Sequence, residues 1–275
     1  MKILRVFPHK TKASPDDADV RFGYPGMFDK ADKIHISATF RWDLKLAESL
    51  SKAWSVIAPV EIGGPALDDK GGDFVPGLYI KNGYTFTSRG CPNKCFFCDA
   101  WKREGDIREL PIMAGNNVLD NNLLACSDSH VQAVFDMLKT QKSVEFTGGL
   151  EAERLRDWHV EQLAIIKPKQ MFFAYDAPND YEPLVRAGKM LSAVELLNSH
   201  RGRCFVLIGF RGDTPDKAYG RLRNTMKAGF MPMAMFYRPD NYAPITKEWH
   251  DLQWLYSRPA AMRKEYLELN KILRN

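Results

Sequence analysis

The sequence lacks the features of a membrane or secreted protein. No apolar run among its 275 residues reaches the roughly 18 residues that a bilayer-spanning helix needs. The opening residues, MKILRVFPHKTK, contain an apolar stretch far too short for a signal peptide. The net charge is only +5, an excess too small to indicate nucleic-acid binding by itself. We therefore expect a cytoplasmic protein with no membrane partner.

Cysteine is scarce, and its placement is uneven. The chain has five cysteines, and three of them, Cys91, Cys95 and Cys98, lie within eight residues. Cys126 and Cys204 stand alone. A disulfide framework is not expected in a chain of this length in a reducing compartment, where clustered thiols more often bind metal. The sequence therefore predicts a metal centre at the three clustered cysteines.

Residues 1–80 are predicted to form a small α/β unit. The helix in this unit is indicated by apolar residues at every fourth position, namely Trp42, Leu46, Leu50 and Trp54. Candidate strands precede and follow it, which is typical of a βαβ unit. The expected strands cover residues 2–7, 33–40 and 56–62, and the helix covers 42–54. A Gly-Gly-Pro turn and an Asp/Gly-rich loop over 66–77 end the unit.

Residues 81–240 alternate between candidate strands and helices, which predicts a parallel sheet. The expected strands cover 84–88, 117–120, 144–147, 171–175, 204–208 and 233–237, and the helices cover 130–139, 151–166, 181–198 and 215–228. Thr214 is a suitable N-cap for the last of these helices because Pro215 follows it. Six units are too few for an eightfold barrel. We therefore predict a partial (β/α)6 TIM-like barrel, with a C-terminal helical extension over 241–275 that carries one or two helices from residue 246.

The three clustered cysteines fit an iron–sulfur cluster better than a zinc ion. Three thiolates can hold three irons of a [4Fe-4S] cluster and leave one iron open for reaction. Zinc needs four ligands, and no second cysteine pair follows. Its fourth ligand would have to come from a distant residue. The candidates are Cys126, Cys204, His130 and His159.

The spacing of these cysteines resembles the signature of the radical S-adenosylmethionine (SAM) family. That signature is C-x3-C-x-φ-C with φ aromatic, and here it is matched by Cys91, Cys95, Phe97 and Cys98. The resemblance covers residues 83–238 and places the motif after the first strand. It implies a [4Fe-4S] cluster on the three cysteines, with SAM bound beside it at the carboxyl ends of the strands and Phe97 among the SAM contacts.

Further segments match the family in chain order. Thr147, Gly148 and Gly149 end the third strand and resemble a Gly-Gly-Glu motif whose backbone meets the SAM amino group. This sequence departs from that motif, because Leu150 intervenes before Glu151. The resemblance leaves open which carboxylate meets the amine. A plain turn between strand and helix is the alternative.

Two more strand ends are implied as SAM contacts. Tyr175 and Asp176 are expected near the ribose or carboxylate, although Asp176 could instead cap the next helix. Ile208 and Gly209 are expected beside the adenine, and a core strand followed by a glycine turn is the alternative. Two further sets of residues are weaker candidates for SAM contacts. Residues 120–122 also suit a turn, and Arg103 with Glu104 also suit an ion pair. Four arginines could face a phosphate or simply cover an exposed helix, namely Arg201, Arg203, Arg221 and Arg223.

The N-terminal unit resembles a reduced form of the cobalamin-binding domain that precedes some radical SAM cores. The Asp-x-His-x-x-Gly pattern of that domain is missing, so we expect no cobalamin and a role as a cover or substrate platform. His9 and His35 could belong to a ligand site in this unit. Core and turn positions are the more common places for such residues.

The resemblance implies an oxygen-sensitive enzyme that cleaves SAM reductively. The products would be methionine and a 5′-deoxyadenosyl radical, which abstracts hydrogen from a nucleotide or another small molecule. An electron donor such as flavodoxin or ferredoxin would supply the electron. Methylthio transfer is disfavoured, because only Cys126 and Cys204 remain for a second cluster. The alternatives are a non-catalytic iron–sulfur electron carrier or redox sensor, and a zinc-stabilised nucleic-acid-binding protein.

Overall fold

The computed structural model describes residues 1–70, 73–238 and 245–271, and the chain divides into two compact units. The first unit comprises Met1–Tyr84 and Lys102–Glu104, and the second comprises Thr85–Trp101 and Gly105–Asn275. Both units combine helices with parallel β-sheet. Within the described residues, no helix has the length and apolar character needed to cross a membrane.

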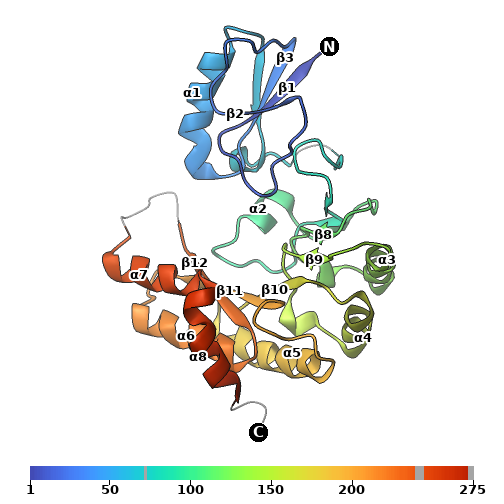
Figure 1. Cartoon of the computed structure of the whole chain (residues 1–275), viewed down its shortest axis with the longest axis vertical. Helices are drawn as coiled ribbons and strands as arrows, with labels where there is room; N and C mark the ends of the chain where they lie inside the picture. Colours follow the sequence, from blue (N-terminus) through green and yellow to red (C-terminus); the bar gives the residue numbers. More distant parts are fainter. Residues whose placement is uncertain (71–72, 239–244, 272–275) are drawn as a thin grey trace. The chain divides into compact units, whose positions relative to one another are not determined.

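The first unit is built on a four-stranded sheet with the order β2-β1-β3-β4 (Figure 1). The neighbouring strands β2 and β1, β1 and β3, and β3 and β4 pair in parallel. Helix α1 connects β3 to β4, so the predicted βαβ unit is confirmed. The elements are β1 (Ile3–Phe7), β2 (Val20–Phe22), β3 (Lys33–Ser37), the 3-10 turn η1 (Arg41–Asp43), α1 (Leu44–Trp54), β4 (Val60–Gly63) and the 3-10 turn η2 (Pro65–Leu67).

One strand of this unit begins later than the sequence predicted. The strand expected over 56–62 starts at Val60, because the preceding residues complete the end of α1. The Ser55 N–H donates to the Ser51 carbonyl, and those of Ile57 and Ala58 donate to the carbonyl of Trp54. These bonds satisfy helix-terminal carbonyls that would otherwise lack partners.

The second unit contains a six-stranded sheet with the order β12-β11-β10-β9-β8-β5. The four neighbouring pairs from β8 to β12 are parallel. The strands are β5 (Tyr84–Thr85), β8 (Asn117–Val118), β9 (Glu145–Phe146), β10 (Gln170–Ala174), β11 (Gly202–Ile208) and β12 (Met231–Phe236). The intervening helices are α3 (Asp128–Lys139), α4 (Asp157–Ile166), α5 (Tyr181–Ala193) and α6 (Pro215–Lys227). The predicted alternation is confirmed, and Figure 1 shows α3, α4, α5 and α6 succeeding one another from right to left around the sheet.

Strand β11 shows how this sheet separates its two faces. Cys204, Val206 and Ile208 are fully buried and belong to the core that the helices cover. Phe205 and Leu207 alternate with them, so they lie on the opposite face, where they are only half-buried. Helix α6 follows this strand, and the Thr214 side chain accepts a hydrogen bond from the Lys217 N–H, as the sequence predicted.

The strand predicted over 84–88 is divided in the structure. Only β5 joins the six-stranded sheet, while β6 (Ser88–Arg89) pairs antiparallel with β7 (Arg108–Glu109). The chain leaves the sheet at Thr87, whose N–H donates to the Asp120 side chain.

Two helices also differ from their predicted limits. The expected helix over 151–166 begins with the 3-10 turn η4 (Ala152–Arg154), and α5 ends before Glu195, which adopts φ 57°.

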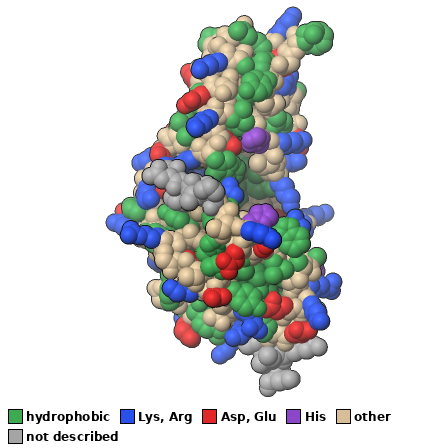
Figure 2. Space-filling model, turned by 90° about the vertical axis from the view of Figure 1, so that its left-hand side faces the viewer, with side chains coloured by type: hydrophobic (Ala, Val, Ile, Leu, Met, Phe, Trp, Pro, Cys, Tyr) green, Lys and Arg blue, Asp and Glu red, His purple; other side chains and the backbone are tan. Residues whose placement is uncertain are grey.

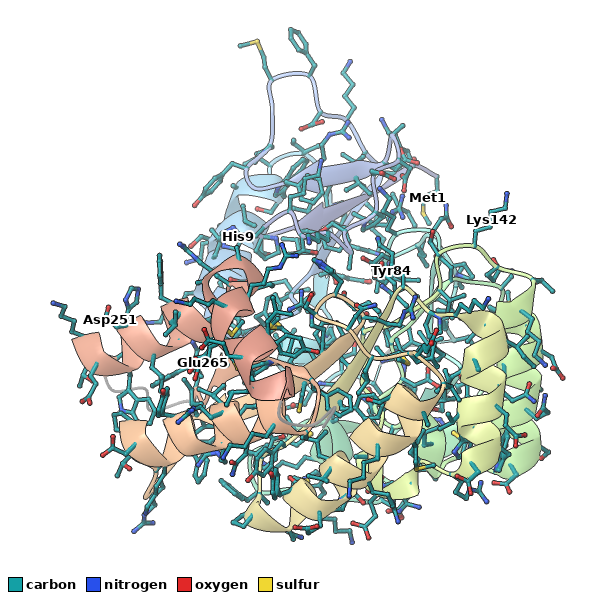
Figure 3. The ribbon with its side chains drawn as sticks, turned by 60° about the horizontal axis from the view of Figure 1, so that its bottom comes forward. Met1, His9, Tyr84, Lys142, Asp251 and Glu265 are labelled. Atoms are coloured by element: carbon teal, nitrogen blue, oxygen red, sulfur yellow. The ribbon has the colours of Figure 1, made fainter. Side chains whose placement is uncertain are left out.

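The C-terminal helices belong to the second unit. They are α7 (Lys247–Tyr256) and α8 (Pro259–Lys271), and residues 272–275 of the predicted tail lie outside the described part of the chain. Tyr256, Met262 and Tyr266 join the core of this unit. The Tyr256 hydroxyl donates to Glu265 at 3.0 Å, and Glu265 is labelled on α8 in Figure 3. These contacts attach the helical extension to the six-stranded domain.

Candidate functional site

The three clustered cysteines lie on one loop between β6 and helix α2 (Ala100–Glu104). All three are free and half-buried. The loop is closed on itself, because the Cys91 N–H donates to the Gly105 carbonyl at 3.1 Å. Inside it, the carbonyl of Cys95 accepts from the Cys98 N–H at 3.2 Å and from the Trp101 ring N–H at 2.8 Å. The cysteine loop is therefore an ordered segment that presents three thiols.

The thiols are close enough to influence one another. The pKa of Cys95 is raised to about 11, first by burial and then by the charges of Cys98 and Cys91. The carboxylates of Asp176 and Asp180 raise it further. Without a cation, the Cys95 thiol therefore stays protonated at neutral pH. A bound cation would favour its thiolate form.

The three thiols match the number of cysteine ligands that an iron–sulfur cluster with one open iron requires. Among the described residues, no three His, Cys, Asp or Glu side chains lie close enough together to hold one metal ion. A tetrahedral zinc site would need its sulfur ligands about 3.8 Å apart, since each Zn–S bond is about 2.3 Å. In a four-iron cluster each thiolate binds a different iron.

The distant residues considered as a fourth zinc ligand have other environments. Cys204 is fully buried in the core, and burial raises the pKa of its thiol. Burial also raises the pKa of Cys126 to about 11. His159 is fully buried and accepts a hydrogen bond from the Arg156 N–H. His130 lies 3.7 Å from Glu109. None of these contacts involves the cysteine loop.

Asp120 fastens the start of the cysteine loop. It follows β8 and is only 1 % exposed. Its carboxylate accepts hydrogen bonds from the Thr87 N–H at 2.6 Å, the Thr87 hydroxyl at 2.5 Å and the Ser88 hydroxyl at 2.7 Å. Burial raises its pKa, while these hydrogen bonds act in the opposite direction. The neighbouring Asn121 accepts from the Gly90 N–H at 3.0 Å, so two successive side chains hold the loop in place.

The glycine pair after β9 lies against the end of β8. The Gly148 N–H donates to the Val118 carbonyl at 3.0 Å. A Cβ atom on Gly148 would lie 2.4 Å from the Asp120 carbonyl oxygen, so only glycine fits there. Gly149 has φ +110°, and a Cβ there would meet nothing within 4 Å. The Thr147 hydroxyl donates to Asn117 at 2.6 Å. Gly149 therefore offers open backbone to a ligand.

The residue inserted after the glycines takes a core position. Leu150 is 3 % exposed, and its N–H donates to the Phe172 carbonyl. Glu151 then turns towards the cysteine loop. Its carboxylate accepts from Asn93 at 2.9 Å, from Asn122 at 2.6 Å and from Arg154 at 2.6 Å. The departure from the family motif thus leaves a carboxylate beside the cysteines, held by three donors.

The end of β10 brings a buried acid into the same region. Asp176 accepts a hydrogen bond from the Leu207 N–H at 2.7 Å, and burial raises its pKa to about 6. The alternative that Asp176 caps the next helix is wrong, because Asp180 accepts from the N–H groups of Asp176 and Ala177 instead. Tyr175 is 5 % exposed, and its ring stacks on Tyr181 at 5.6 Å.

The raised pKa of Asp176 predicts a pH-dependent gain in stability on replacement by Asn. Its folded pKa of about 6 exceeds the reference value of 3.8, so Asp176 stabilises the fold fully below about pH 3.8 and loses that contribution as the pH rises through 6. Asn keeps the acceptor for Leu207. The free energy of unfolding of cluster-free D176N, measured by urea denaturation, should therefore rise relative to that of the wild type between pH 4 and pH 7. An equal difference at both pH values would contradict this.

The remaining predicted SAM contacts occupy different surroundings. Ile208 is fully buried on the helix-covered face, and the N–H of Gly209 donates to Asp213 at 2.9 Å. Phe97 is half-buried and meets Phe96 at 5.1 Å between ring centroids.

Phe96 is a residue that the sequence analysis did not select. It is 62 % exposed, and its ring lies 6.0 Å from Phe210 and 6.3 Å from Tyr237. These two residues follow β11 and β12, so an aromatic group joins the cysteine loop to two strand ends. The paired phenylalanines inside the cysteine motif were the available signal.

The charged residues considered at the sequence level are engaged elsewhere. Arg103 pairs with Glu104 at 3.0 Å, as the ion-pair alternative predicted. Arg221 is largely buried, pairs with Asp213 at 2.7 Å and donates to the Leu207 carbonyl. Arg203 lies on β11, and burial lowers its pKa. The interpretation as exposed helix surface is therefore wrong for Arg203 and Arg221.

Two cavities lie away from the cysteine loop. One of about 750 Å³ lies at the amino ends of β11 and β12, lined partly by Lys189, Asn198 and Lys227. The other, about 540 Å³, is in the first unit and includes His35, whose ring bonds to the Tyr79 hydroxyl at 2.7 Å. His9, labelled in Figure 3, lies 3.5 Å from Asp43. Neither cavity includes a predicted SAM contact.

No model of a protein family and no curated protein sequence matches this chain. Figure 2 shows acidic and basic side chains interspersed over the face it presents.

Proposed function

We propose that the chain is a radical SAM enzyme, with a [4Fe-4S] cluster on Cys91, Cys95 and Cys98. We also propose that the six-stranded sheet is part of a partial (β/α)6 barrel. The observation that carries the proposal is the contact between the cysteine loop and two strand ends. Asn122 after β8 and Glu151 after β9 meet each other, and Asn122 also reaches the sulfur of Cys91.

In this proposal the three thiolates bind three irons, and the fourth iron is open to SAM. When bound, the cluster supplies the electron that cleaves SAM into methionine and a 5′-deoxyadenosyl radical, which takes hydrogen from a nucleotide or another small molecule. The protein binds and orients SAM. Gly149 admits the ligand close to the backbone, because its Cβ position is open.

The charges around the cysteines suit SAM, which carries a positive sulfonium and ammonium. Asp176 and Asp180 act electrostatically on Cys95, and Glu151 is tied to the cysteine loop. Carboxylates this close to the cysteines favour the binding of a cation beside them. Phe97 and Tyr175 supply aromatic surface, and the backbone at Ile208 and Gly209 is proposed to pass beside the adenine. An electron carrier such as flavodoxin or ferredoxin would deliver the electron.

The test is cleavage of SAM under anaerobic conditions. Protein reconstituted with iron and sulfide and reduced with dithionite should convert SAM to 5′-deoxyadenosine. C91A should fall to the level of dithionite and SAM alone, because one iron loses its ligand. C126A is the matched control, since Cys126 lies outside the cysteine loop, and it should keep the activity.

Two outcomes would point away from this function. If the wild type produces no more 5′-deoxyadenosine than C91A, the proposal fails. A protein that holds an iron–sulfur cluster but shows no calorimetric binding of SAM would instead be an electron carrier or redox sensor. Zinc without iron or sulfide, in protein prepared without air, would indicate the zinc-stabilised alternative.

A further inference from the structure

The side chain of Asn122 joins a cysteine of the loop to the carboxylate that follows the glycine turn. Its amide Nδ2 lies 3.5 Å from the Cys91 sulfur and 2.6 Å from Glu151 Oε2. Asn122 is only 4 % exposed. An amide group has two N–H donors on this nitrogen, so one can serve each acceptor.

The orientation of this amide is fixed by what it faces. If the amide were flipped, its carbonyl oxygen would face the Glu151 carboxylate oxygen at 2.6 Å, and both atoms are acceptors. In the orientation observed, Oδ1 is buried and has no hydrogen-bond partner among the described residues. A buried acceptor without a partner is energetically unfavourable. The two N–H contacts must therefore offset that cost.

Glu151 is held on its other side as well. Its Oε1 accepts from Asn93, which lies in the cysteine loop between Cys91 and Cys95. Arg154 pairs with Oε2 at 2.6 Å. Glu151 is therefore anchored by three donors, and it in turn fixes the position of the Asn122 amide.

We infer that Asn122 is a positioning residue that tunes the cluster through an N–H···S hydrogen bond to Cys91, with Glu151 as its anchor. This inference rests on the proposed function, because it assumes the cluster. Donors to cluster sulfurs stabilise the reduced, more negative state, and so they raise the reduction potential. Asn122 therefore makes the cluster easier to reduce than it would be without this donor.

The test is the midpoint potential of the reconstituted cluster, measured without SAM by a redox titration followed by electron paramagnetic resonance. N122L keeps the side-chain shape but has no donor, and N122A removes the group altogether. Both should hold the same iron content as the wild type and have a more negative midpoint potential. N116L is the matched control. It makes the same substitution at Asn116, whose amide donates to the Lys142 carbonyl at an exposed site, so its potential should equal that of the wild type.

The inference is wrong if both Asn122 variants have the wild-type potential, or if N116L shifts the potential as much as they do. Failure of both Asn122 variants to hold iron would also contradict it, because the inference assigns tuning and not retention to this amide. The measurement needs no SAM. A wild type that holds the cluster but does not cleave SAM refutes the proposed function alone, and unchanged potentials in an active enzyme refute only the role of Asn122. A wild type that takes up no cluster overturns both.

Discussion

Replacement of Asp120 by Ala is expected to lower the free energy of unfolding by about 3–5 kcal/mol, because a buried hydrogen-bonded acceptor is removed. Asp120 accepts from one backbone N–H and two hydroxyls, all of which are buried. Alanine leaves the Thr87 N–H with no acceptor in its place. Chemical denaturation monitored by circular dichroism measures the loss.

Two further variants separate this effect from a general change of charge. D120N keeps an oxygen for the Thr87 N–H, and the hydroxyls of Thr87 and Ser88 can rotate to accept from the new amide. It should cost only about 1 kcal/mol. D136A removes an exposed carboxylate from α3 and should change stability by no more than about 0.5 kcal/mol. A loss in D120A as small as that in D136A would show that Asp120 does not hold the loop.

Replacement of Gly148 by Ala is expected to cost about 2–3 kcal/mol, because the new methyl group meets rigid backbone. Its Cβ would lie 2.4 Å from both the Asp120 oxygen and the Leu119 carbonyl carbon. The neighbouring strand ends would have to move apart. Because Asp120 sits on the displaced segment, G148A should also lower the amount of cluster bound after reconstitution. Thermal denaturation and iron content measure the two effects.

Gly220 provides the matched control for this substitution. It lies in helix α6, and a Cβ there would meet nothing within 4 Å. Alanine is the better helix former by about 1 kcal/mol, so G220A should raise stability. The G148A and G220A substitutions are therefore expected to change the free energy of unfolding in opposite directions. A small stabilisation in both variants would refute the close contact at Gly148.

Much of the fold was predictable because alternation and capping are local signals. The run of apolar residues over 204–208 predicted β11, and the Thr214-Pro215 pair predicted the start of α6. Strand β2 was missed, because the segment Val20–Phe22 is too short to show a period. The division of 84–88 was also missed. It depends on the pairing of β6 with β7 and on the Asp120 side chain, and no local pattern shows either of them.

The candidate site was predictable in part, for the same reason. Cysteine spacing is a local pattern, and so is a pair of glycines after a strand. Asn93 was not selected, and Asn122 was named only as part of a weaker set, since each stands in a segment that reads equally well as a turn. Their common partner, Glu151, is far from both in the sequence, and only the fold brings the three together. Asp176 and Asp180 show the same limit, because either acid could have capped the helix.

The two ends of the cysteine loop are fixed against each other. Ser88 and Arg89 pair with Glu109 and Arg108, and the Cys91 N–H meets the Gly105 carbonyl. The ends of such a loop stay in place when residues are gained or lost on its far side, since added loop length costs little free energy. Evolution could therefore vary the segment after Cys98 in length and composition without disturbing the geometry of the three sulfurs. The paired strands β6 and β7 thus form the base of the loop, and Asp120 and Asn121 fasten its start.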